Sequence, residues 1–186
     1  MGKFDTPRQR DFVLNELARL SIQGAFLRGR VYPKTLPPVP KSVDDQRTQL
    51  RKELVGLLRG YEKQYAVAVE PMNHENNIEA IKSTLNTKFR GCLLNQEFRI
   101  GTAQKALNLY LKYLWCLGEV ALPPHCPFDA IVIAELNFPR GTTRPVWTKI
   151  NSIEEYRKLV EAAKAKAGEK SLAQWEMELW GNKSTP

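Results

Sequence analysis

The chain has 186 residues, of which 42% are hydrophobic and 26% charged, a composition typical of a folded globular protein of roughly one domain. No run of the sequence is apolar enough to predict a transmembrane helix. Three cysteines are too few for a disulfide framework or for a four-cysteine iron–sulfur cluster. Residues 1–5 lack the apolar region of a secretory signal, so we expect a cytoplasmic protein.

Lysine and arginine outnumber aspartate and glutamate by 28 to 20, which gives a formal net charge of +8. The excess falls within residues 1–150. A basic protein of this kind is suited to a polyanionic partner, so we expect nucleic acid, and DNA first, with no membrane partner. The alternative is a basic protein that has no such partner.

The first predicted helix covers residues 11–30, where apolar residues recur at helical spacing. Four prolines within residues 31–43 predict an extended connector, either a stiff link or a docking segment for a protein partner. We therefore divide the chain into an N-terminal helix with its Pro-rich connector, residues 1–43, and a helical core domain, residues 44–186. The two parts are expected to form one compact domain.

The core domain reads as a series of helices joined by loops. Gly101 indicates a turn at residues 96–103, and the strongest helical pattern follows it, up to a stop at Gly118. Two Ser-x-x-Glu/Gln patterns, at Ser152 and Ser171, predict capping boxes at two helix starts. No alternating pattern of strands is present, so we predict an all-α compact bundle of about seven helices. The predicted elements are helices over 44–69, 75–95 and 104–118, a short apolar helix or strand over 129–137, and helices over 152–167 and from 171 onward.

A short polar stripe lies on the strongest predicted helix. Lys105, Asn108 and Lys112 fall together at helical spacing, opposite the apolar side. A solvated helix face is the ordinary explanation of such a stripe. The alternative is that Lys105, in the first turn after Gly101, belongs to a functional site.

Asp129 follows a loop with three prolines and precedes an apolar run. Its carboxylate is placed to cap the next helix, by accepting from free backbone N–H groups. Alternatively, Asp129 and Lys105 meet in one cleft. A lysine amine that loses its proton can attack an electron-poor carbon such as a sugar C1′, and a nearby carboxylate can stabilise the developing positive charge.

The stretch from Phe98 to Lys105 resembles the hairpin of the helix-hairpin-helix DNA glycosylase superfamily, with Gly101 four residues before the lysine. Pro127-Phe128-Asp129 is similar to the Pro-Val-Asp that carries the catalytic aspartate in that family. The resemblance covers residues 98–129 and is nearest to the archaeal 8-oxoguanine branch. It implies a helix-hairpin-helix glycosylase-like fold, DNA repair by excision of a flipped base, a Schiff-base role for Lys105 and a catalytic acid role for Asp129.

We therefore expect a DNA glycosylase, with or without β-lyase activity. The alternative is a non-enzymatic basic helical module that binds nucleic acid or a protein. No cofactor is expected, and the two histidines and three cysteines lack the spacing of metal ligands, so no metal site is predicted. The candidate nucleic-acid contacts are Arg99, Ile100, Gly101, Thr102, Asn108, Lys112, Arg140 and Arg144.

Overall fold

The computed structural model describes residues 4–34 and 40–184, and within these ranges the chain forms seven α-helices and no strand. The prediction of an all-α bundle is confirmed. No helix in the same ranges combines the length and apolar character that crossing a membrane requires. The helices are α1 (Pro7–Phe26), α2 (Lys41–Gly60), α3 (Pro71–Phe89), α4 (Ile100–Cys116), α5 (Ala130–Glu135), α6 (Ile153–Ala167) and α7 (Leu172–Ser184).

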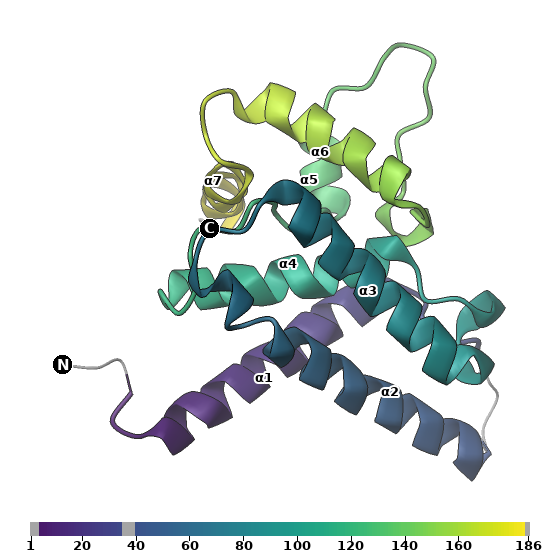
Figure 1. The fold of residues 1–186 in the computed structure, drawn as a ribbon. Helices are drawn as coiled ribbons and strands as arrows, with labels where there is room; N and C mark the ends of the chain where they lie inside the picture. Colours follow the sequence, from purple (N-terminus) through teal and green to yellow (C-terminus); the bar gives the residue numbers. More distant parts are fainter. Residues whose placement is uncertain (1–3, 35–39, 185–186) are drawn as a thin grey trace.

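Helix α4 is the centre of the molecule. It lies between α1 on one side and α6 on the other, and it also contacts α2 and α3 (Figure 1). Leu107, Tyr110, Leu111 and Leu114 are all fully buried. Because neighbouring helices surround α4, part of its polar side is enclosed as well, which decides where several candidate site residues lie.

Local capping fixes several helix starts. Ser152 and Glu155 form the predicted capping box at the start of α6, with both reciprocal hydrogen bonds present. Helix α3 begins at Pro71, earlier than predicted, because proline is well suited to the first helical position. Helix α4 begins at Ile100, so the prediction of a turn around Gly101 is wrong: Gly101 is helical, and its lack of a side chain serves close packing.

The N-terminal helix belongs to the same core. Helix α1 packs on α4 and α2, with Leu14, Ala18 and Ala25 fully buried in the contact. Of the Pro-rich connector, residues 35–39, on which the predicted docking role falls, lie outside the described part of the chain.

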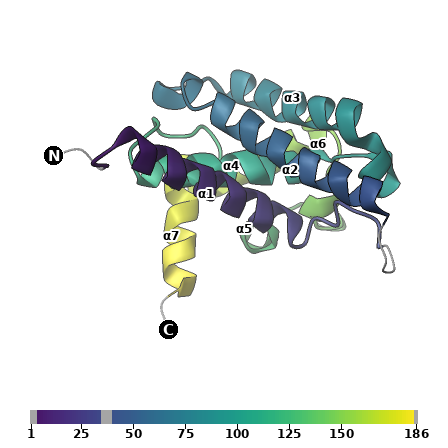
Figure 2. The ribbon, with the colours of Figure 1, turned by 90° about the horizontal axis from the view of Figure 1, so that it is seen from below.

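Helix α7 extends away from the other helices along its second half (Figure 2). Its first half packs against the bundle, where Leu172 and Trp175 are buried. An ion pair ties it to α4, with Lys112 Nζ 2.6 Å from Glu176 Oε2. Further along, the Trp180 side chain is 59% exposed.

Candidate functional site

The structure brings Lys105 and Asp129 together. Lys105 lies in the second turn of α4 and Asp129 is the residue before α5, and the distance from Lys105 Nζ to Asp129 Oδ2 is 3.4 Å. Both side chains are partly accessible, at 13% and 27% exposure. The sequence left open whether Lys105 and Asp129 meet, and the structure confirms that their side chains are in contact.

Each member of the pair has a second contact. Asp129 Oδ1 accepts hydrogen bonds from the backbone N–H groups of Ile131 and Val132, so the carboxylate also caps α5. Lys105 Nζ lies 4.6 Å from the centre of the Trp147 ring, a cation–π contact. Both interpretations of Asp129, helix cap and partner of Lys105, hold together because its two oxygens are used separately.

The backbone from Ile100 to Thr102 is not open to a ligand. The Gly101 N–H donates to the carbonyl of Ile150 at 3.0 Å, and Ile100 and Thr102 are 1% and 2% exposed. A Cβ at position 101 would overlap the Trp147 carbonyl oxygen. The assignment of Ile100, Gly101 and Thr102 to phosphate binding is therefore a misreading of this glycine, whose amide is already satisfied within the protein.

Asn108 does not lie on a solvated stripe either, because it is fully buried. Its side-chain N–H₂ donates to the Tyr156 hydroxyl and to Gln104 Oε1, both at 3.2 Å. Gln104 in turn bonds the backbone of Phe128 through both ends of its amide, at 2.8 and 3.1 Å. This buried network joins α4 to α6 and to the segment that leads to Asp129, so Asn108 acts in positioning rather than in contact with DNA.

The network continues into two buried histidines. His125 Nδ1 lies 2.9 Å from the Tyr156 hydroxyl, and His74 Nδ1 lies 2.6 Å from the Tyr65 hydroxyl. The two imidazole rings meet edge to face, 4.8 Å apart. Burial lowers the pKa of His74 to about 3 and lowers the pKa of His125 well below its usual value. Both rings are therefore neutral at physiological pH.

Lys112 is likewise removed from the predicted nucleic-acid face. It forms its ion pair with Glu176, whose side chain is only 9% exposed, and it faces the Trp180 ring at 5.8 Å. Burial raises the pKa of Glu176, and the neighbouring Lys112 opposes that shift. The role of Lys112 in this structure is to hold α7 against α4.

A large groove opens beside the Lys105–Asp129 pair. It has a volume of about 910 Å³ and is shared by the segments at residues 28–30, 94–99 and 144–151, with α5 as one wall. Trp147, whose ring contacts Lys105, lines this groove, and so does Ala130, the residue after Asp129. Neither Lys105 nor Asp129 is itself a lining residue. The groove cations are Arg28, Arg30, Arg99, Arg144 and Lys149.

The charge of this groove is of one sign. No acidic residue lines it, and none of its five cations forms an ion pair with a carboxylate in the described ranges. Cations elsewhere, such as Arg59, Lys112 and Arg157, are paired with acids. Arg99 is fixed in place by donating to the Thr148 carbonyl at 2.8 Å. We call this groove, with its five cations and the other residues that line it, the arginine groove.

Two of the predicted contacts, Arg99 and Arg144, lie in the arginine groove, while Arg140 is exposed in the preceding loop and does not line it. The sequence reasoning missed Arg28 and Arg30. The signal in the sequence was the Arg28-Gly29-Arg30 run at the end of the first predicted helix, residues 11–30.

The described residues contain no group of three or more His, Cys, Asp or Glu side chains that would hold a metal ion. Comparison with protein families, with curated proteins and with solved structures found no match to this chain. The fold and the site therefore define a basic protein that is all-helical over its described residues, with a cationic groove beside a lysine–aspartate pair.

Proposed function

We propose that this protein binds nucleic acid through the arginine groove. The observation that supports the proposal is the set of five cations around one concave surface, with no acid among the described lining residues and no ion pair from these cations to a described carboxylate. Unpaired guanidinium groups at a groove are suited to phosphates, because they donate several hydrogen bonds in a planar fork. Binding of this kind reads the phosphate backbone and carries little sequence information.

The groove walls also favour an extended polyanion over a small one. The five cations come from three separate chain segments that share a groove of about 910 Å³, so the groove offers several phosphate contacts rather than one. Apolar side chains, including Ile133, Pro145 and Val146, also line the groove. Val146 is 50% exposed and offers a surface for sugar or base edges. A strand of nucleic acid supplies both phosphates and apolar faces at such spacing.

The proposal is tested by fluorescence anisotropy with a labelled DNA duplex and the matching single strand. The groove variant is Arg28→Gln with Arg144→Gln, since both side chains are exposed and their loss leaves the fold intact. The control is Lys158→Gln with Lys166→Gln, which removes the same charge from exposed positions on α6. We expect the groove variant to bind roughly tenfold more weakly and the control to bind like wild type. An equal loss of DNA affinity in both variants would show that net charge, and not the arginine groove, determines binding.

A second candidate function, base excision, is favoured by one specific observation, the 3.4 Å contact between Lys105 Nζ and Asp129 Oδ2 beside the arginine groove. In such a reaction the Lys105 amine, after losing a proton to solvent, attacks the sugar C1′ of a flipped nucleotide. The glycosidic bond breaks, and the nucleobase leaves with the electron pair of that bond and takes up a proton. The C1′–O4′ bond then opens, which leaves a Schiff base between Lys105 and C1′ and a hydroxyl group at C4′. Asp129 stabilises the positive charge that develops on the sugar.

Base excision is tested with duplexes that carry an abasic site or 8-oxoguanine. Borohydride is added to trap a Schiff base, and base release is measured separately. Wild type is expected to form the covalent adduct, Lys105→Met to lose it, and the surface control Lys158→Gln to keep it. If no adduct and no base release occur on either substrate while DNA binding is intact, the function is binding without excision.

A further inference from the structure

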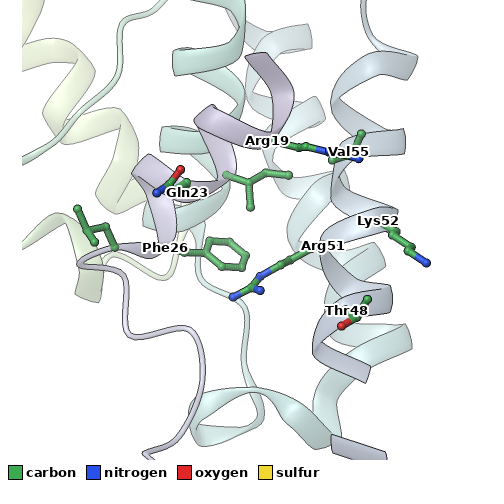
Figure 3. Close-up of a pocket in the computed structure, with 9 residues that line it drawn as sticks. Arg19, Gln23, Phe26, Thr48, Arg51, Lys52 and Val55 are labelled. Carbon is green, nitrogen blue, oxygen red and sulfur yellow. The ribbon is translucent and has the colours of Figure 1, made fainter. Parts of the chain in front are cut away.

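A second concave surface lies on a different part of the molecule, between α1 and α2. Figure 1 shows these helices meeting near the C-terminal end of α2 and diverging toward the C-terminal end of α1, and Figure 3 shows the space between them. The space between them has a volume of about 720 Å³ and is lined by the second half of α1 and by residues 48–55 of α2. We call it the α1–α2 wedge. Its lining includes none of the residues of the arginine groove.

The inside of the wedge is apolar and firmly supported. Ile22 is 4% exposed and joins the hydrophobic core. Phe26 turns its ring into the gap between the helices (Figure 3) and is backed by the rings of Tyr32 and Phe98, at 5.8 and 6.0 Å. Leu27 and Val55 complete the apolar lining, and Leu27 is 79% exposed. Burial of such a surface by a ligand is favourable in proportion to the apolar area removed from water.

The rim of the wedge is cationic. Among the described lining residues, the charged ones are Arg19, Arg51 and Lys52. Arg19 is paired with Glu16 at 3.0 Å. The Arg51 side chain extends from α2 toward Phe26 (Figure 3), and its guanidinium lies 5.6 Å from the Tyr32 ring. Among the described residues no carboxylate forms an ion pair with Arg51 or Lys52.

We propose that the α1–α2 wedge binds a free single-chain carboxylic acid, with the hydrocarbon chain against Phe26 and Ile22 and the carboxylate on Arg51. The argument is charge complementarity: the Arg51 guanidinium, which has no acidic partner in the described part of the chain, lies at the edge of the apolar lining, and its fork of N–H donors matches a carboxylate. The volume is within the range of small-molecule sites.

This site differs in chemistry from the arginine groove. There, five cations surround a surface suited to many phosphates, whereas the wedge places the Arg51 guanidinium beside the apolar side chains of Ile22, Phe26 and Val55. A polyanion would leave the Phe26 and Leu27 surfaces unused, and a neutral hydrocarbon would not supply an acidic partner for Arg51, which has none among the described residues. The amphiphilic acid is the ligand class that satisfies both parts at once.

The test titrates full-length protein with decanoate, with decanol and with butyrate by calorimetry, and records amide shifts by NMR. We expect saturable binding of decanoate at a single site, with shifts gathered at Gln23, Phe26, Thr48 and Val55. Decanol, which lacks the charge, is expected to bind about tenfold more weakly, as the loss of one charge-assisted hydrogen bond implies. Butyrate, which lacks the long chain, is expected not to saturate.

Two variants make the result specific. Arg51→Gln should reduce decanoate affinity to that of decanol, and Lys166→Gln, an equal charge change on α6, should leave it unchanged. Equal affinity for decanoate and decanol, or shifts that gather outside the wedge, would overturn the proposal. So would a failure of decanoate to bind while an acidic amphipathic peptide shifts the same amides, which would make the wedge a protein-docking surface.

Discussion

Gly101 on α4 lies directly against the backbone of Trp147, so closely that a side chain at position 101 would overlap the Trp147 carbonyl oxygen. The Gly101 N–H donates to Ile150 on the same segment. Trp147 lines the arginine groove and contacts the amine of Lys105. The absence of a side chain at one helical position thus sets where the groove lies relative to the Lys105–Asp129 pair.

Gly101→Ala is expected to destabilise the protein by about 1–3 kcal/mol, because the new methyl group must displace backbone atoms. Gly56→Ala provides the matched control. It lies within α2 with no atom near the position of an added Cβ, so alanine should stabilise the helix by up to about 1 kcal/mol. Urea denaturation of both variants measures the change in unfolding free energy, which should have opposite signs in the two. An unchanged stability of Gly101→Ala would contradict the close packing of Gly101 against Trp147.

Tyr156→Phe is expected to cost about 1–3 kcal/mol of stability, since the hydroxyl joins His125 to Asn108 inside the core and its removal leaves buried polar groups unsatisfied. Tyr113→Phe is the comparison. Its ring is half-buried, and no hydrogen bond of its hydroxyl is found within the described residues. Thermal and urea unfolding should separate the two. Equal stability of both variants would argue against a structural role for the network.

The buried histidines make stability sensitive to acid. The pKa of His74 is about 3 in the folded protein against an ordinary value of 6.5, so between these values the unfolded chain binds more protons. Stability is therefore expected to fall as the pH drops below about 6.5, by up to about 1.4 kcal/mol per pH unit for this group. His74→Gln should flatten the slope of unfolding free energy against pH. An unchanged slope would show that His74 is not buried in its neutral form.

Asp129→Asn separates the two roles of this residue. Asparagine is as good a helix cap as aspartate, so stability is expected to change little, whereas Asp129→Ala should lose about 1 kcal/mol. Only the charge next to Lys105 disappears in Asp129→Asn. If base excision occurs, this variant should lose base release while keeping its fold and its DNA affinity. Full activity in Asp129→Asn would remove the carboxylate from the chemistry.

The local parts of the fold were predictable because their causes are local. The capping box at Ser152 fixes the start of α6 within a single turn. The Lys105–Asp129 contact could be offered as an alternative because the two residues lie at the starts of consecutive predicted elements, residues 104–118 and 129–137. The turn predicted at Gly101 failed for a non-local reason, since this glycine accommodates a segment almost fifty residues further along the chain.

The same distinction explains the misplaced polar residues. Asn108 has the helical position of a surface residue, and only Tyr156, 48 residues later, makes it a buried one. Lys112 meets its partner Glu176 64 residues later. The arginine groove is assembled from three separate segments, so no single stretch of sequence displays it. Contacts between residues so far apart in the chain produce no periodic pattern in the sequence from which they could be predicted.

The salt dependence of DNA affinity tests the central claim most directly. Each phosphate that the groove neutralises adds about 0.9 to the steepness of log affinity against log salt concentration for duplex DNA. With most of the five cations engaged, we expect a wild-type slope of about −3 to −4. Arg28→Gln with Arg144→Gln should make the slope about 2 units less steep, and Lys158→Gln with Lys166→Gln should leave it unchanged. A groove variant with the wild-type slope would show that DNA does not bind at the arginine groove.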